Sequence, residues 1–199
     1  KVEPGQAFDR LVVDRVEHSS TRAMRSLAFR ILRMKEQPGL FATTFMGVHT
    51  GVGNSGIVKN VAQTISNTGA RVLILSTEAQ EIPSHWTQIE RRNTPEGFSA
   101  YLDEESGITT LWPHPGTFLN INLLFSFYAE RADMMLIDAQ PILVSDVSES
   151  MAGASDLVLL VQCEDQHRQR HWRTIAAFRI PFWECPAFDR TQSSTLSIG

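Results

Sequence analysis

The chain has 199 residues, of which 42% are hydrophobic and 20% are charged, and its formal net charge is −4. This composition is ordinary for one globular domain with a sizeable core. The negative net charge gives no bulk electrostatic case for binding nucleic acid or anionic lipid, so neither is an expected partner. No apolar run approaches the ~20 residues that span a bilayer, so we expect no direct membrane insertion.

The two cysteines, Cys163 and Cys185, are too few for a disulfide framework. A reducing compartment fits this usage best, and we expect a cytoplasmic protein. Residues 1–15 are mixed polar and charged, which is not the pattern of a signal peptide. The sequence begins with Lys1 rather than Met, which leaves open that it is part of a longer protein.

Helical and strand patterns alternate along the chain between an arm at 1–19 and a loose tail at 186–199, so we interpret 20–185 as one domain. In chain order, the patterns predict helices over 21–34, 57–67, 119–131, 147–154 and 166–178, with a further short helix around 97–104. The strands predicted between them lie over 40–48, 72–75, 109–112, 134–137 and 157–162. A strand–helix–strand unit over 40–75 makes its two strands parallel. The fold predicted is a three-layer α/β sandwich with a mostly parallel central sheet.

A glycine-rich stretch, GVHTGVGNSG at 47–56, joins the first strand to its helix. A phosphate site of this type needs a flexible loop whose amides turn inward and a helix that begins at the anion. A lysine normally reaches the outer phosphates, and the Ser or Thr after it binds Mg²⁺. Here Ser55 stands at the Mg²⁺ position, but the lysine position is Asn54. The candidate nucleotide-binding residues are Gly51, Val52, Gly53, Asn54, Ser55 and Gly56.

An amide in place of the lysine carries no charge, so Asn54 cannot offset a triphosphate or stabilise its transition state. Lys59 lies about a turn and a half into the helix, and we do not expect it to substitute. Two interpretations stay open. The loop either retains its glycines for a tight turn alone, or it still holds an anion through amides and the helix dipole. No cofactor is required, and ATP or ADP with Mg²⁺ is the candidate ligand.

Asp138 directly follows the strand predicted over 134–137. Ligands bind at the carboxyl ends of strands in open α/β sheets, so Asp138 is placed to hold Mg²⁺ together with Ser55. The alternative is that Asp138 caps the turn that follows it.

Five segments in this chain occur in an order typical of one protein family. They are the helix at 22–31 (RAMRSLAFRI), the glycine-rich loop and helix at 47–62, the second strand at 71–80 (RVLILSTEAQ), the polar segment at 83–107 and the strand with its exit at 133–146 (DMMLIDAQPILVSD). Together they resemble the cytoplasmic domain of bacterial tyrosine kinases and polysaccharide co-polymerase proteins, a branch of the Mrp/MinD-type P-loop ATPases. The resemblance spans roughly residues 15–175 and implies a P-loop NTPase-like fold.

This chain departs from the family at the residues that carry charge. The family's second strand has two aspartates and an arginine, and the matching positions are Ser76, Glu78 and Gln80. With Asn54, these substitutions remove three charged groups from one expected pocket, while Glu78 keeps a carboxylate. A site in use would not be expected to lose all three together.

Two further family features are reduced. The helix before the P-loop normally uses a glutamate and two arginines to join subunits in a ring, and the matching positions are Arg22, Arg25 and Ala28. Only Arg25 remains of that set. The kinases also phosphorylate a tyrosine-rich tail, whereas this chain has only Tyr101 and Tyr128.

These departures favour a catalytically defective, regulatory or scaffold component of bacterial exopolysaccharide biosynthesis or export. One alternative is a divergent ATPase or tyrosine kinase whose missing lysine comes from elsewhere, such as a neighbouring subunit. Another is a sensor of a nucleotide or other anion. The resemblance implies a membrane-embedded polysaccharide co-polymerase as partner, with a homo-oligomer also allowed, and a peripheral position at the inner membrane through that partner.

Two other groups of residues were considered near the C-terminal end. Cys163, His167 and His171 are four residues apart, which would be metal-like spacing on one helix. Cys163 directly follows the predicted strand, however, and arginines neighbour both histidines, so we favour a solvated helix face. A cluster of aromatic residues predicts core packing, with a docking patch as the alternative; its members are Trp172, Phe178, Phe182 and Trp183.

Overall fold

The computed structural model describes residues 10–14, 19–35, 38–77, 82–117, 120–141, 146–166, 169–178 and 196–197. Its strands are β1 Phe41–Gly47, β2 Val72–Ser76, β3 Trp86–Gln88, β4 Phe98–Asp103, β5 Ile108–Pro113, β6 Met134–Ala139, β7 Leu157–Gln166, β8 Gln169–Phe178 and β9 Leu196–Ser197. Its helices are α1 Leu11–Asp14, α2 Ser19–Met34, α3 Asn54–Ser66, α4 Ile121–Tyr128 and α5 Asp146–Ala154, with a 3₁₀ turn at Arg91–Asn93.

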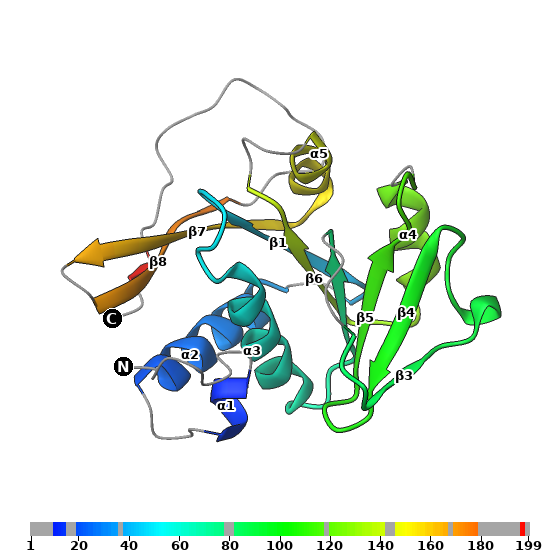
Figure 1. Cartoon of the computed structure of the whole chain (residues 1–199), viewed down its shortest axis with the longest axis horizontal. Helices are drawn as coiled ribbons and strands as arrows, with labels where there is room; N and C mark the ends of the chain where they lie inside the picture. Colours follow the sequence, from blue (N-terminus) through cyan, green and yellow to red (C-terminus); the bar gives the residue numbers. More distant parts are fainter. Residues whose placement is uncertain are drawn as a thin grey trace.

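The described strands form one nine-stranded sheet in the order β3-β4-β5-β2-β6-β1-β7-β8-β9. The five central strands, β5 to β7 in that order, are mutually parallel. Strands β1 and β2 are parallel, as predicted, but β6 lies between them. Antiparallel strands extend the sheet at both ends, with β3 and β4 on one side and β8 and β9 on the other (Figure 1).

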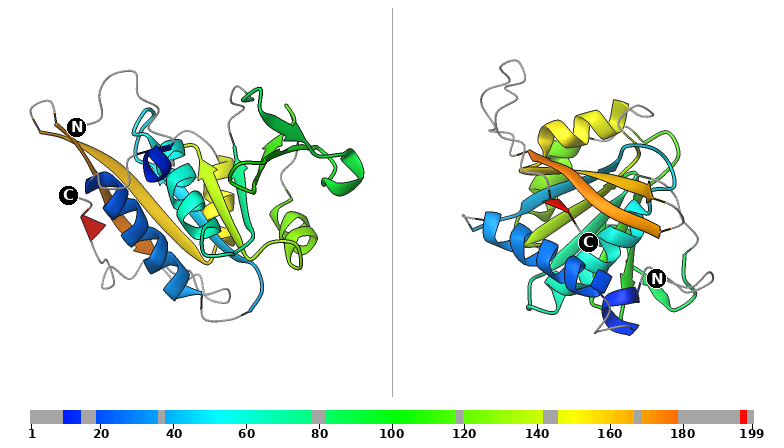
Figure 2. Two further views of the ribbon diagram at one scale, coloured as in Figure 1. Left: turned by 90° about the horizontal axis from the view of Figure 1, so that it is seen from below. Right: turned by 90° about the vertical axis from the view of Figure 1, so that its left-hand side faces the viewer.

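Helices cover both faces of the central strands, which confirms the three-layer α/β prediction. Helices α2 and α3 lie on one face, and α4 and α5 lie on the other (Figure 2). Strands β1, β2 and β6 are buried along their whole length. This double burial is the reason that they read as continuous apolar runs in the sequence.

The short helix predicted around 97–104 is wrong, because this segment is strand β4. Phe98 and Ala100 are buried against the sheet core, while Ser99 and Tyr101, which alternate with them, are only half-buried. This alternation has the period of a strand. Pairing with β3 and β5 on its two sides then satisfies the backbone of β4.

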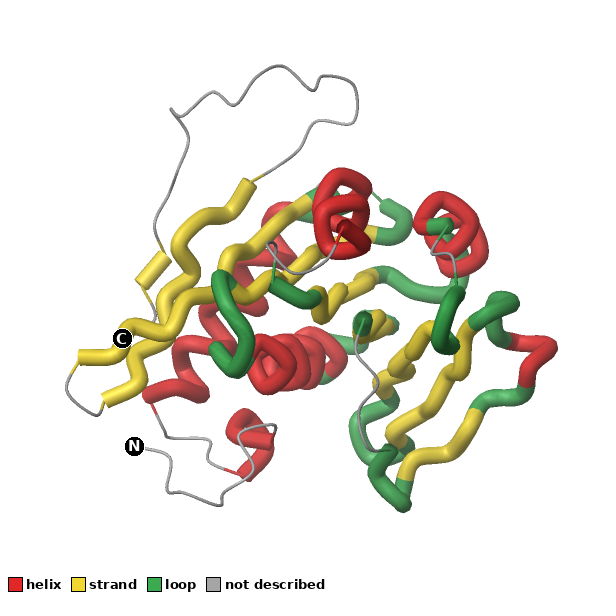
Figure 3. The backbone as a smooth tube through the Cα atoms, turned by 45° about the horizontal axis from the view of Figure 1, so that its top comes forward, coloured by secondary structure: helices red, strands yellow, loops and turns green. Residues whose placement is uncertain are grey.

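The helix predicted over 166–178 is also wrong. Strands β7 and β8 form an antiparallel pair that runs from Gln166 opposite Gln169 to Val158 opposite Phe178 (Figure 3). The solvated helix face expected for the two histidines therefore does not exist. Cys163 lies on β7 opposite Trp172 of β8. The side chains from 163 onward, including His167, His171 and the aromatic cluster at 172–183, lie outside the described part of the chain.

Two segments predicted to be irregular contain regular structure. Leu11–Asp14 of the expected arm forms α1, and Leu196–Ser197 of the expected tail forms β9, which pairs with β8. Among the described residues, no helix is both long enough and apolar enough to cross a bilayer.

Asn60 fastens α1 to α3 from inside the core. Its side chain is fully buried, its Oδ1 accepts a hydrogen bond from the Val12 backbone N–H at 2.9 Å, and its Nδ2 donates to the Gly56 carbonyl at 2.7 Å. Buried polar groups of this kind are expensive to leave without partners.

We expect Asn60→Ala to lower the free energy of unfolding by about 2 kcal/mol, because the Val12 N–H would lose its only described partner inside the core. Urea denaturation would measure the change. Gln63→Ala is the matched control, since the Gln63 side chain makes an exposed bond to Asn67; it should cost less than about 0.5 kcal/mol. Equal losses in the two variants would contradict this role for Asn60.

Asp133 joins three strands at the amino-terminal edge of the sheet. Its carboxylate accepts bonds from the backbone and side chain of Arg71, which precedes β2, and its carbonyl accepts the Phe41 N–H at the start of β1. The Lys35 ammonium also donates to that carbonyl at 3.0 Å. The side-chain and backbone hydrogen bonds from Arg71 lower the pKa of Asp133 to about 2.

A carboxylate whose pKa is lowered by folding stabilises the fold above its unfolded pKa of about 4, and this contribution is lost as the pH falls toward the folded value. We therefore expect wild type to exceed Asp133→Asn in unfolding free energy at pH 7, with a difference that shrinks between pH ~4 and ~2. Solvent screening of this half-exposed pair keeps the difference near or below about 1 kcal/mol. Denaturation at several pH values would test this, and a pH-independent difference would contradict it.

Candidate functional site

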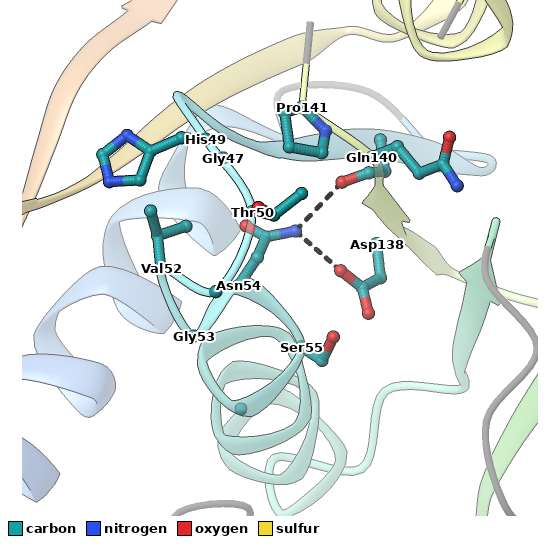
Figure 4. Close-up of a pocket in the computed structure, with 13 residues that line it drawn as sticks. Gly47, His49, Thr50, Val52, Gly53, Asn54, Ser55, Asp138, Gln140 and Pro141 are labelled. Carbon is teal, nitrogen blue, oxygen red and sulfur yellow. Dashed lines mark hydrogen bonds between the residues drawn. The ribbon is translucent and has the colours of Figure 1, made fainter. Parts of the chain in front are cut away.

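A pocket of about 420 Å³ opens at the carboxyl ends of β1 and β6. Three segments line it: the loop after β1, the first turn of α3 and the turn after β6 (Figure 4). All six residues predicted as nucleotide-binding line this pocket, and so does Asp138. The remaining lining residues are Gly47, His49, Thr50, Ala139, Gln140 and Pro141. Parallel strands place their carboxyl ends at one edge, which explains why segments distant in sequence meet here.

Glycines shape the loop so that it can turn back over the start of α3. A Cβ added at Gly47 would lie 2.7 Å from a Val52 methyl group and 2.9 Å from the His49 carbonyl oxygen, so a larger residue does not fit. Gly53 has φ 84°, a left-handed conformation that favours glycine.

Helix α3 begins at Asn54, three residues before the predicted start at Ile57. The apolar periodicity used for the prediction starts only at Ile57, because the first turn is polar and faces the pocket. Gly53 precedes the helix and supplies no side-chain cap. The first amide groups of an α-helix lack intrahelical partners, and together with the helix dipole they favour an anion.

The Asn54 side chain donates into a group of three oxygen atoms. Its Nδ2 lies 2.6 Å from Asp138 Oδ1, 3.0 Å from the Phe45 carbonyl and 3.4 Å from the Ala139 carbonyl. All three are acceptors, so the amide can be oriented only with its nitrogen toward them. The residue at the lysine position thus bridges β1, β6 and α3. Figure 4 shows its bond to Asp138.

The other end of this amide is unsatisfied. Asn54 Oδ1 is buried and accepts no hydrogen bond within the described part of the chain. Buried acceptors without a partner are uncommon in folded proteins, and a pocket ligand or water with an N–H or O–H group would satisfy it. The position therefore favours a donor beside Asn54 rather than a phosphate oxygen, which is itself an acceptor.

Ser55 and Asp138 were predicted as Mg²⁺ ligands, and the pocket brings them together. Figure 4 shows the Ser55 hydroxyl and the Asp138 carboxylate pointing to the same side of the pocket. Hydroxyl and carboxylate oxygens are suitable donors for Mg²⁺. Within the described residues, however, no group of three or more His, Cys, Asp and Glu side chains forms a metal site. The donor set fits a water-rich ion carried in on a phosphate rather than a dedicated protein site.

No lysine or arginine lines the pocket among the residues described, and Asp138 adds a negative charge. Lys59 lies outside the lining. Ser76 is buried and sits beside Asp138 in the register of β2 and β6, without reaching the lining. Glu78 and Gln80 lie outside the described residues.

Sequence reasoning missed the contributions of Ala139, Gln140 and Pro141 to this pocket. Their position directly after a predicted buried strand was the available signal, because such turns lie at the ligand-binding edge. It also missed Phe45, whose carbonyl is an Asn54 acceptor. A backbone carbonyl leaves no trace in residue identity.

Three solved structures resemble this fold over most of the chain. The chimerical protein CapA2B2 matches with a TM-score of 0.63 and 13% identity, over 82% of this chain and 80% of its own. The BceF tyrosine kinase domain matches with a TM-score of 0.56 and 17% identity, over 75% of this chain and 67% of its own. The kinase domain of the Escherichia coli tyrosine kinase ETK matches with a TM-score of 0.51 and 13% identity, over 77% of this chain and 66% of its own.

The chain has the fold of these tyrosine kinase domains. At such low identity the likeness concerns the fold, and it confirms that part of the resemblance seen in the sequence. No protein-family model matches the chain, and no curated protein does.

Neither tyrosine of this chain is fully exposed. Tyr128 is 6% exposed, and burial raises the pKa of its phenol to about 12. The Tyr101 ring packs at 5.1 Å from the ring of Trp112. A phosphate acceptor has to enter an active site, and a ring that is buried or packed against another ring does so only after local opening.

We expect Asn54→Ala to destabilise the domain by about 1–3 kcal/mol, because Asp138 is only 8% exposed and would lose a hydrogen-bond donor. Asn54→Asp should be worse at neutral pH, since it sets two carboxylates side by side, and should recover in acid as one becomes protonated. Thermal unfolding across pH would measure both. Wild-type stability in Asn54→Asp at neutral pH would contradict the bridging role of Asn54.

Proposed function

We propose that this domain is a catalytically defective relative of the tyrosine kinases, acting as a regulatory or scaffold component of bacterial exopolysaccharide biosynthesis or export. The observation that carries the proposal is the Asn54 bridge. The residue at the lysine position donates to Asp138, Phe45 and Ala139, all within the protein. Its amide hydrogens are thereby directed at the protein's own oxygens rather than at a phosphate.

The missing charge is large on the scale of binding energies. Two unit charges 4 Å apart interact by about 4 kcal/mol at an effective dielectric constant of about 20. Losing one such lysine–phosphate pair weakens binding by about a thousandfold. Asp138 opposes the phosphates further unless Mg²⁺ intervenes. The same charge acts more strongly in a phosphoryl-transfer transition state, so catalysis would suffer more than binding.

The exopolysaccharide role rests on the family resemblance in the sequence and on the shared fold with BceF and ETK kinase domains. In this proposal the domain works through its surfaces, with a membrane-embedded polysaccharide co-polymerase or another polysaccharide synthesis protein as partner. It would then lie in the cytoplasm, at the inner membrane through that partner. A homo-oligomer is compatible with this role.

A second candidate is a sensor of a small anion or nucleotide. It is favoured by the start of α3, where Gly53 provides no side-chain cap and the pocket of about 420 Å³ is open. Amides and a helix dipole can hold an anion without a lysine. Pyrophosphate without Mg²⁺ is the probe for this candidate, because it tests the loop amides and the dipole alone.

Isothermal titration calorimetry of Mg·ATP and Mg·ADP would test the proposal. We expect wild type to give no binding in the micromolar range. Asn54→Lys should bind about a hundredfold to a thousandfold more tightly, because it restores the charge that contacts the phosphates. Asn54→Met is the matched control, since it has similar length without charge, and it should resemble wild type.

Micromolar binding by wild type would instead support the divergent ATPase or sensor. ATP hydrolysis and autophosphorylation assays would separate these two. Activity of wild type above that of Asp138→Asn would sink the catalytically defective assignment. Pyrophosphate binding without turnover would support the sensor.

A further inference from the structure

Helix α2 presents a basic surface on the outside of the domain. Its sequence, SSTRAMRSLAFRILRM, contains four arginines and no acidic residue. Arg22, Arg30 and Arg33 are exposed, and Arg25 is half-buried. With Phe29, the three exposed arginines form a surface that we call the basic stripe. Their spacing of three, four and eight residues places them along one side of the helix.

The arginines of this helix lack carboxylate partners within the described part of the chain. None of the four forms an ion pair or a side-chain hydrogen bond with a described residue. By contrast, exposed Arg10, Arg71 and Arg92 all pair with carboxylates. Among the residues that the structure describes, the basic stripe is therefore a concentration of unpaired positive charge, on a chain whose net charge is −4.

Two apolar side chains accompany this charge. Phe29 lies within the basic stripe and is 49% exposed, and Met34 at the end of the helix is 37% exposed. Arginine around an exposed aromatic residue on an amphipathic helix is the pattern of a helix that lies on a membrane surface.

The opposite side of α2 is anchored in the core. Met24, Leu27, Ala28 and Ile31 are buried and pack with α3 and the sheet. Figures 1 and 2 show α2 along the outer edge of the helical layer that covers this face of the sheet. The helix is thus held rigidly, so binding through the basic stripe does not require the helix to fold first.

We propose that the basic stripe of α2 binds the surface of an anionic lipid bilayer. The negative net charge of the chain opposes binding to an anionic surface by the molecule as a whole. Adsorption depends on local charge, however, because at physiological salt the electrostatic field decays within about 8 Å. Each arginine near such a surface contributes about 1 kcal/mol, and the Phe29 ring can enter the headgroup region. This binding needs no nucleotide and does not rest on the proposed function.

A bilayer fits this surface better than a second copy of the chain does. One acidic cluster among the described residues is the turn after β4, and its carboxylates already have internal partners. Asp103 accepts from Ser106, Glu104 from Thr87 and Glu105 from Arg10. Anionic headgroups, in contrast, are laterally continuous and can match any spacing of arginines.

Co-sedimentation of the 199-residue chain with vesicles would test the proposal. We expect binding to phosphatidylcholine–phosphatidylglycerol vesicles mixed two to one, weaker binding as salt rises to ~0.15 M, and none to phosphatidylcholine alone. Arg30→Gln/Arg33→Gln should bind about thirtyfold more weakly, from about 1 kcal/mol for each arginine.

The matched control is Arg91→Gln/Arg92→Gln, which removes the same charge from two exposed arginines in the 3₁₀ turn. It should bind within about twofold of wild type if the site is local. No binding of wild type to mixed vesicles at low salt would overturn the proposal, as would equal losses in both double variants. Arg30, Arg33, Arg91 and Arg92 are all exposed, so circular dichroism should show that both double variants fold as wild type does.

Discussion

Side-chain hydrogen bonds hold strand β6 to its neighbours at both of its ends, and the central sheet and the pocket depend on these two sets of bonds. At the amino-terminal edge, Asp133 binds Phe41, the first residue of β1, and Arg71, which directly precedes β2. At the carboxyl edge, the Asn54 amide joins Asp138 and Ala139 of β6 to Phe45 of β1. One set of bonds aligns the strands where they enter the sheet. The other closes the edge at which α/β proteins bind their ligands.

The Asn54 bridge links the stability of the domain to phosphate binding in the pocket. An amide at this position serves the protein's own oxygens, whereas a lysine would extend past them toward a ligand. In the proposed function, the same residue therefore strengthens the scaffold and weakens the site for phosphate. Stability and activity are in competition at such a position, which is common where functional sites carry unpaired charge. A domain retained for its surfaces is free of that competition.

Positive charge is concentrated on helix α2 rather than around the pocket. The pocket has no lysine or arginine among its described lining residues, while α2 carries four arginines. Cationic side chains favour binding of anions wherever they lie unpaired near a surface. The distribution is the reverse of that expected for a working kinase, in which the positive charge would surround the phosphates. It suits a protein that binds through its outer faces.

The sequence by itself determined the central layers and the position of the site. Continuous apolar runs marked the buried strands, and the glycines of 47–56 marked the loop, because these features depend on local burial and backbone freedom. Tertiary structure alone decided the two antiparallel edges, where 97–104 and 166–178 become strands by pairing with neighbours that no local period reveals. It also decided what Asn54 does, because its partner Asp138 is 84 residues away in the chain and only the parallel register of β1 and β6 brings the two side chains within 2.6 Å.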